Sequence, residues 1–119
     1  MTIIDLYTQH YLGESSIILQ EKRNNQILFK VILLNYHFNE ILNLIPLGQY
    51  HSESVMYNYF RKNGWYDDEW ECLRKQEFMD QLIAINDLVL GEFVEPYNAI
   101  KQICQSAISN NNGLFIELL

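Results

Sequence analysis

The sequence predicts one α+β domain over residues 1–119, with four or five helices packed on a small sheet of about three strands. The length is that of a typical single domain, and 49% of the residues are apolar, which is enough to form a core. Two β-rich runs follow each other within residues 15–35, and helical periodicity marks most of the remaining chain. Because strands and helices are grouped rather than alternating, the expected class is α+β.

The first segment, MTIIDLYTQHYLGE, predicts a helix that ends at Gly13. Thr2 and Asp5 have the form of a short capping box at its start. The apolar residues that follow at helical spacing are Ile3, Leu6, Tyr7 and Tyr11. We therefore expect the chain to begin with a helix.

A β-hairpin is predicted next. The β-rich runs SSIILQE and QILFKVILLN flank KRNN, in which asparagine tolerates the dihedral angles of a turn. The second run is apolar on both faces, so we expect it to be a central strand covered on both sides. A last strand, LFIELL, follows the break at NNNG and is expected to join the same sheet.

Two short helices are predicted in the middle of the chain. NEILNLIP gives one or two helical turns between Asn39 and Pro46. Ser52 is the expected N-cap of a second helix, which runs to about Asn63. Two basic residues in the last turn of this helix suit the negative end of its dipole.

Two longer helices complete the prediction. One spans about residues 67–85. The other begins at Pro96, which fits a first helical position, and its apolar stripe is Tyr97, Ile100, Ile103, Cys104, Ala107 and Ile108. Cys72 and Cys104 both fall on apolar helical positions, so we expect two buried thiols rather than a disulfide.

The net charge of −7 is concentrated in one part of the chain. Residues 1–50 are nearly neutral, whereas residues 67–95 hold nine acids against Arg74 and Lys75. The nine acids are Asp67, Asp68, Glu69, Glu71, Glu77, Asp80, Asp87, Glu92 and Glu95. Binding to phosphates, in nucleic acid or on an anionic membrane, requires a basic face, so we expect neither partner. A basic protein is the complementary partner.

The sequence shows no motif of catalysis or of metal or cofactor binding. The three histidines lack zinc-ligand spacing, the five glycines stand singly, and DDEWE lacks the ligand pattern of an EF-hand loop. A small enzyme would need His37 or His51 to meet an acid in a pocket. We therefore expect a protein that is not an enzyme and that has no metal and no cofactor.

The expected location is the cytoplasm. No apolar run approaches the roughly 20 residues of a membrane-spanning helix. The N-terminus lacks the basic start, apolar stretch and cleavage site of a signal peptide.

The stretch GWYDDEWE, residues 64–71, has two interpretations. In the first it is a helix start, in which Asp67, Asp68 and Glu69 occupy the first turn and Trp65 packs back as a hydrophobic staple. In the second it belongs to a protein-binding surface, where tryptophan supplies buried area and carboxylates steer and pair with basic groups.

The second interpretation rests on the spacing beyond this stretch, and the helix start stays open beside it. In a helix that begins at Asp67, Trp70 would share one face with the residues three, seven and ten positions after it. These residues are Leu73, Glu77 and Asp80. A solvent face would not normally carry a tryptophan, and a core face would not carry two acids. The candidate binding residues are therefore Trp65, Tyr66, Asp67, Asp68, Glu69, Trp70, Glu71, Leu73, Glu77 and Asp80.

A small domain that is acidic over one segment, rich in Tyr and Trp, and without catalytic motifs resembles the immunity proteins of bacterial toxin–immunity pairs, including those of contact-dependent growth inhibition. The resemblance extends over the whole chain in character and is strongest at WYDDEWE with Glu77 and Asp80. It implies a cytoplasmic inhibitor that binds the catalytic domain of a cognate toxin, which is basic when the toxin is a nuclease.

Two alternatives to an immunity protein remain besides the small enzyme. One is a phage-type inhibitor or nucleic-acid mimic that acts on a host nucleic-acid enzyme, with binding that weakens as salt rises. The other is a non-catalytic adaptor subunit, in which Trp70 and Leu73 form an obligate interface.

Overall fold

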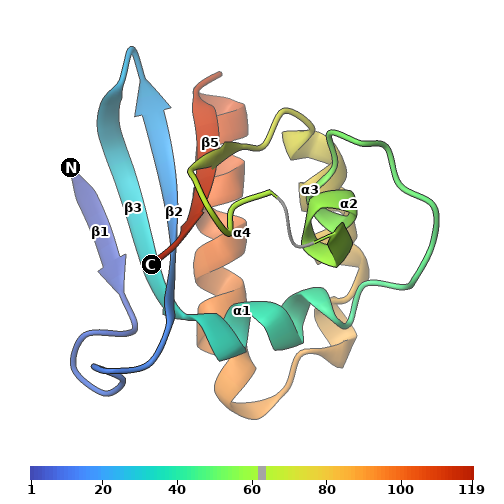
Figure 1. Cartoon of the computed structure of the whole chain (residues 1–119), viewed down its shortest axis with the longest axis horizontal. Helices are drawn as coiled ribbons and strands as arrows, with labels where there is room; N and C mark the ends of the chain where they lie inside the picture. The colour runs from blue at the N-terminus through green and yellow to red at the C-terminus, as the bar shows by residue number, and fades with distance from the viewer. Residues whose placement is uncertain (62–63) are drawn as a thin grey trace.

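The computed structural model describes residues 1–61 and 64–119 (Figure 1). The strands are β1 (Thr2–Asp5), β2 (Ser16–Arg23), β3 (Gln26–Leu34), β4 (Trp70–Glu71) and β5 (Gly113–Leu118). The helices are α1 (Asn35–Leu42), α2 (Val55–Arg61), α3 (Lys75–Ala84) and α4 (Val94–Ser109), with the short 3-10 helices η1 (Asn86–Leu88) and η2 (Gly91–Phe93). The described residues thus form one α+β fold with four α-helices and five strands, where about three strands were predicted.

The five strands form one mixed sheet in the order β1-β3-β2-β5-β4. The predicted hairpin of β2 and β3 is confirmed, and its turn residues Asn24 and Asn25 have positive φ values of 51° and 66°. Asparagine adopts this left-handed conformation readily, and a two-residue hairpin turn with matching twist needs it. The predicted last strand also joins this sheet, since β5 pairs antiparallel with β2.

β3 is an inner strand of the sheet, as predicted, because it pairs with β1 on one side and with β2 on the other, but it is fully covered on one face only. Phe29, Val31 and Leu33 are buried, whereas Leu28 and Ile32 on the opposite face of β3 are half-buried. The expectation of a strand covered on both sides was therefore wrong. Apolar residues on a partly exposed sheet face carry the same sequence pattern as residues under a second layer.

The core lies between the sheet and α4, which packs on β2, β3 and β5 (Figure 1). The predicted apolar stripe of this helix is confirmed, because all its residues are buried except Ile108, which is half-buried. The sheet side chains that are fully buried are Ile17, Leu19, Val31, Leu33, Leu114 and Ile116. No helix in residues 1–61 and 64–119 is long and apolar enough to cross a bilayer.

The first segment is a strand, so the predicted N-terminal helix was wrong. β1 pairs parallel with β3, from Thr2 opposite Phe29 to Asp5 opposite Ile32. Asp5 does cap backbone amides, but its Oδ1 accepts the N–H groups of Tyr7 and Thr8 in a turn after the strand. Pairing with a remote strand outweighs the local helical spacing of the apolar residues here.

The two middle helices exist with shifted bounds. α1 follows β3 directly, so the predicted start at Asn39 falls inside the helix. The N-terminal cap of α2 is Ser54 rather than Ser52, since Ser54 Oγ accepts the N–H of Tyr57 at 3.1 Å. The predicted continuation of this helix over residues 62–63 lies outside the described residues.

The helix predicted over residues 67–85 begins at Lys75 instead. The preceding residues extend the sheet: Trp70 and Glu71 pair with β5, and the N–H of Cys72 donates to the carbonyl of Leu114 at 2.8 Å. Both cysteines are buried free thiols, as predicted, and burial raises the pKa of each to about 12.

Candidate functional site

The stretch GWYDDEWE forms an irregular loop beside β5 that leads into the edge strand β4. Contacts with β5 fix both ends of the loop. At one end Trp65 is only 1% exposed, and its carbonyl accepts the N–H of Leu118 at 3.1 Å. At the other end β4 pairs with β5 in the register Trp70↔Ile116. The acidic residues between these anchors are therefore fixed at the surface rather than placed in the first turn of a helix.

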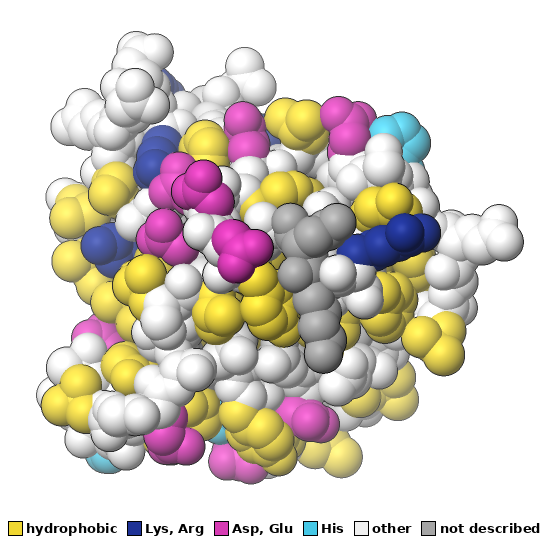
Figure 2. All heavy atoms as spheres, in the orientation of Figure 1, with side chains coloured by type: hydrophobic (Ala, Val, Ile, Leu, Met, Phe, Trp, Pro, Cys, Tyr) yellow, Lys and Arg dark blue, Asp and Glu magenta, His cyan; other side chains and the backbone are white. Residues whose placement is uncertain are grey.

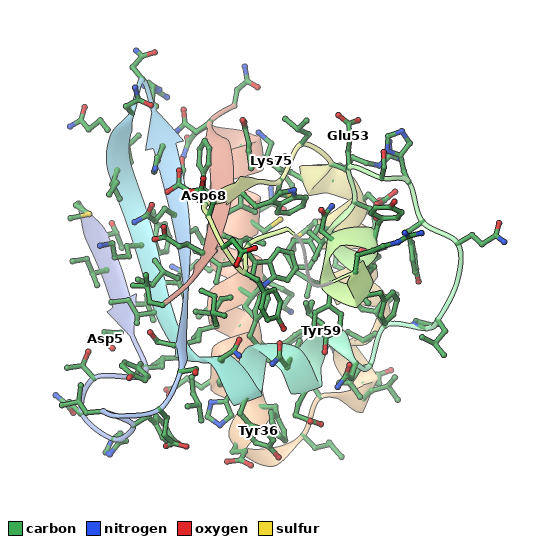
Figure 3. The ribbon with its side chains drawn as sticks, viewed as in Figure 1. Asp5, Tyr36, Glu53, Tyr59, Asp68 and Lys75 are labelled. Atoms are coloured by element: carbon green, nitrogen blue, oxygen red, sulfur yellow. The ribbon has the colours of Figure 1, made fainter. Side chains whose placement is uncertain are left out.

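We call Asp67, Asp68, Glu69 and Glu71 the acidic edge. Figure 2 shows acidic side chains gathered over this part of the molecule, and Figure 3 shows Asp68 beside β5. One member is neutralised, because Lys22 Nζ lies 2.7 Å from both carboxylate oxygens of Glu69. This ion pair ties the loop to β2.

The other three carboxylates of the acidic edge are exposed and unpaired by any basic side chain of the described part of the chain. Asp68 Oδ1 does accept the N–H of Glu69 at 2.9 Å, which orients the loop without neutralising the charge. Three acids within five positions of the chain give this edge a local negative charge, which a basic partner would complement.

A row of five aromatic rings runs from the sheet edge toward the loop before α2. We call it the aromatic row. Its consecutive centroid distances are 5.5 Å for Trp70–Trp65, 6.4 Å for Trp65–Tyr59, 5.6 Å for Tyr59–Phe60 and 6.4 Å for Phe60–Tyr50. Trp65 is its one buried ring, whereas Phe60 is 41% exposed and the other three rings are half-buried. Aromatic side chains beside the acidic edge are what a protein-binding surface requires.

The structure brings together only part of the predicted site. Six candidates lie on the loop and β4 at or near the surface: Tyr66, Asp67, Asp68, Glu69, Trp70 and Glu71. Trp65 is a core residue, so it anchors the loop from inside and cannot contact a partner. Its place before the acids was correctly seen as a packing position, but the element that it holds is not a helix.

The other three candidates do not share a face with Trp70, because Trp70 and Leu73 precede α3. Leu73 lies beside the start of α3, with Arg74 and Glu77. Glu77 is ion-paired with Arg74 at 2.9 Å, and Asp80 Oδ1 accepts a hydrogen bond from Gln76 at 3.0 Å. The predicted common helix face of tryptophan, leucine and two acids was therefore wrong.

Sequence reasoning missed a groove of about 430 Å³ between α1 and α2, next to the aromatic row. The residues that line it are Tyr36, Asn39, Glu40, Asn43, Tyr59, Phe60 and Tyr66. The only available signal was the number of tyrosines, since nothing in the sequence shows that α1 and α2 lie next to each other.

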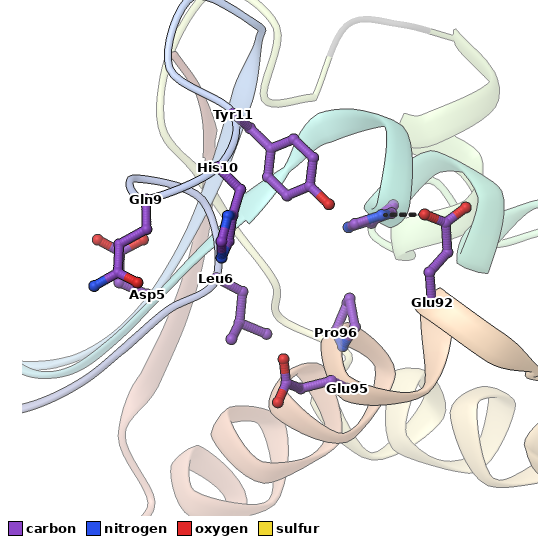
Figure 4. A pocket seen from close by; sticks show the side chains of 9 residues that line it. Asp5, Leu6, Gln9, His10, Tyr11, Glu92, Glu95 and Pro96 are labelled. Atoms are coloured by element: carbon purple, nitrogen blue, oxygen red, sulfur yellow. Dashed lines mark hydrogen bonds and ion pairs between the residues drawn. The ribbon is translucent and has the colours of Figure 1, made fainter.

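A second hollow, of about 310 Å³, lies where the β1–β2 connection meets α1 and the start of α4 (Figure 4). The residues around it are Asp5, Leu6, Gln9, His10, Tyr11, His37, Glu92, Glu95 and Pro96. The dashed line in Figure 4 marks His37 Nε2 and Glu92 Oε2, which are 3.4 Å apart. His37 thus meets an acid at a pocket, whereas His51 is an exposed residue whose Nδ1 accepts the N–H of Glu53.

The surroundings of His37 limit what the ring can do chemically. The Tyr11 and Phe93 rings each pack edge-to-face on it, at centroid distances of 5.6 Å. The ring nitrogen that does not face Glu92, Nδ1, is buried without a hydrogen-bond partner in the described structure. Because Nδ1 is buried, the ring atom nearest to the hollow is Nε2, which already faces Glu92.

Comparison of the chain with protein-family models, with curated proteins and with solved structures finds no match.

Proposed function

We propose that this protein is a cytoplasmic inhibitor of the immunity-protein kind, which binds a basic domain of a cognate protein toxin and has no catalytic activity of its own. The acidic edge carries this proposal: Asp67, Asp68 and Glu71 are exposed, have no basic partner among the described residues, and are fixed by the buried Trp65 and by β4. Fixed charges cost little entropy when a partner binds, and they steer its approach.

The aromatic side chains near the acidic edge supply the apolar part of such an interface. Tyr66 and Trp70 are half-buried, so each presents an exposed portion while its packing restricts the rotamer. Tyrosine and tryptophan are the residues that most often dominate the binding energy of protein interfaces. A basic nuclease domain would place lysine or arginine side chains, which otherwise hold phosphates, against the carboxylates.

The test is partner capture from the native bacterium with two variants of equal charge change. The site variant is Asp67→Asn/Asp68→Asn/Glu71→Gln, and the matched control is Glu14→Gln/Asp80→Asn/Asp87→Asn, whose residues are also exposed. We expect wild type and control to retain a basic toxin domain, identified by mass spectrometry, and the site variant to lose it. Equal retention by both variants would contradict the proposal.

The same capture separates the two rival binding modes. A nucleic-acid mimic would capture a nucleic-acid enzyme of the host. Both variants would weaken this binding to a similar extent, since it depends on overall charge. An adaptor subunit would be an oligomer when purified alone. We expect a monomer whose partner depends on the acidic edge.

The contact between His37 and Glu92 favours a second candidate function, a small enzyme whose site is the hollow of Figure 4. Glu92 is 59% exposed at its side chain, so Glu92→Gln should leave the fold intact. The inhibitor proposal expects this variant to protect cells from the toxin as well as wild type does. Loss of protection by Glu92→Gln, with the acidic-edge variant still protective, would favour the enzyme.

A further inference from the structure

The groove between α1 and α2 combines aromatic walls with hydrogen-bond acceptors. Residues 36, 39 and 40 of α1 and the C-cap residue Asn43 follow at spacings of three and four, so they share the side of the helix that borders the groove. Tyr59 and Phe60 come from α2, and Tyr66 comes from the loop that leads to the acidic edge. The groove is therefore continuous with the proposed binding surface.

The wall of the groove is already ordered. The Tyr59 hydroxyl donates to Asn43 Oδ1 at 2.7 Å, and the Tyr59 ring is stacked on buried Trp65 with an angle of 15° between the ring planes. Burial, followed by the nearby Tyr66 and Glu40, raises the pKa of Tyr59, so the hydroxyl keeps its proton and remains a donor. A ligand would meet a side chain whose rotamer is fixed before binding, which lowers the entropic cost.

The charge of the groove selects a cation. Glu40 is exposed and has no basic partner among the described residues, and no described residue that lines the groove is basic. The faces of tyrosine and phenylalanine rings attract cations as well.

We propose that this groove holds an arginine side chain of the partner, with the guanidinium against the tyrosine rings and paired with Glu40. Guanidinium is planar, stacks on aromatic faces and carries only donors in a fork that matches a carboxylate. A lysine ammonium is a strongly hydrated point charge and uses neither the flat ring faces nor the two carboxylate oxygens as well. The inference rests on the proposed function only in assigning the arginine to a toxin.

The direct test titrates the isolated chain with three small probes and follows its backbone amide NMR signals. The probes are Nα-acetyl-arginine amide, its neutral isostere Nα-acetyl-citrulline amide, and Nα-acetyl-lysine amide. We expect the arginine probe to bind saturably and to shift signals around Glu40, Tyr59 and Tyr66. We expect citrulline, which lacks the charge, to bind about tenfold more weakly or not at all.

Two variants locate the binding. Glu40→Gln should lower the affinity for the arginine probe about tenfold. Glu14→Gln, which changes an exposed acid elsewhere, should leave this affinity unchanged. Absence of saturable binding, equal binding of citrulline, or equal binding by Glu40→Gln would overturn the site. Equal binding of the lysine probe would overturn its assignment to arginine.

The outcome for the groove is separable from that for the function. If the arginine probe binds but no toxin is captured, the groove stands and the proposed function fails. If toxin is captured and Glu40→Gln captures it as well as wild type does, with no probe binding, the function stands and the groove assignment fails.

Discussion

Glu21 shows at the scale of one residue how a charge can be buried without an ion pair. It is 1% exposed, and its carboxylate accepts hydrogen bonds from Ser106 Oγ at 2.5 Å, Asn112 Nδ2 at 2.6 Å and Asn110 Nδ2 at 3.3 Å. Three donors from the end of α4 and the turn after it thus replace the water that the carboxylate loses. This network ties the end of α4 and the turn before β5 to β2.

We predict that Glu21→Gln destabilises the protein by about 2 kcal/mol, because the amide NH2 that replaces one carboxylate oxygen cannot accept the hydrogen bonds which that oxygen accepted. The measurement is the midpoint of urea unfolding. Glu14→Gln, which removes an exposed carboxylate, is the matched control and should change stability by less than about 0.5 kcal/mol. Equal, small effects of the two variants would show that the network around Glu21 does not stabilise the fold.

The two thiols give a prediction about pH. Burial raises the pKa of Cys72 and of Cys104 to about 12, from a usual value of 9.0. Between these values the folded thiols keep their protons and the unfolded thiols lose them, so the stability that they contribute is complete below about pH 9 and falls as pH rises. We expect Cys72→Ala/Cys104→Ala to show a shallower loss of stability than wild type above pH 9 in urea unfolding.

A thiol reagent checks the same property directly. Neither cysteine should react at pH 8 in the native protein, and both should react in denaturant, because only the thiolate attacks and both side chains are buried. A native thiol that reacts as fast as the unfolded one would contradict the burial.

Single residues also mark what sequence could and could not predict at the site. The exposed acids of GWYDDEWE and their proximity to an aromatic cluster were predictable, since both are local in sequence. That Trp65 is buried while Trp70 lies at a sheet edge was not, because each depends on a partner far away: Phe38 for Trp65, and Ile116 for Trp70. The pairing of Lys22 with Glu69 joins residues 47 positions apart and has no sequence signal.

At the scale of elements, the predictions succeeded for long elements whose pattern lies within their own sequence. The hairpin has β-rich strands of eight and nine residues joined by two asparagines, and α4 has a stripe over 16 residues. The failures were β1, with four residues, and β4, with two, both at sheet edges. Such short strands form because a neighbouring strand offers free backbone groups, and two to four residues are too few to show the alternation of a strand in the sequence.

The loop that carries the acidic edge is an element stabilised from its two ends, and the two tryptophans test this. Trp65→Ala should lower the free energy of unfolding by about 3–5 kcal/mol, since it leaves a cavity in the core beside Phe38 and Tyr59. Trp70→Ala should lower the free energy of unfolding by about 2 kcal/mol, because that ring is half-buried at the edge of the sheet. Unfolding in urea gives both values. A larger loss for Trp70 than for Trp65 would contradict the assignment of the inner anchor.

Tryptophan fluorescence gives an independent check on the same element. We expect Trp70→Phe to leave a blue-shifted emission from Trp65 that a soluble quencher reaches poorly. Trp65→Phe should leave the more quenchable emission of Trp70. The reverse order of quenching would exchange the roles of the two residues.

At the scale of the whole molecule, the net charge of −7 is less important than where acids remain unpaired. Among the described residues, Glu69 and Glu77 are neutralised by Lys22 and Arg74, whereas Asp67, Asp68 and Glu71 have no basic partner. The partner-binding surface proposed here therefore runs from the acidic edge along the aromatic row to the groove at Glu40. The hollow at His37, beside the β1–β2 connection, lies outside it.

Hydrogen exchange of the complex with its captured partner tests this surface most directly. We predict slower exchange of backbone amides in residues 66–71 and around the groove of Glu40 and Tyr59 when the partner is bound, with no change at residues 91–96 beside the His37 hollow. Protection confined to residues 5–11 and 91–96, with residues 66–71 unchanged, would contradict the account and place the functional surface at that hollow.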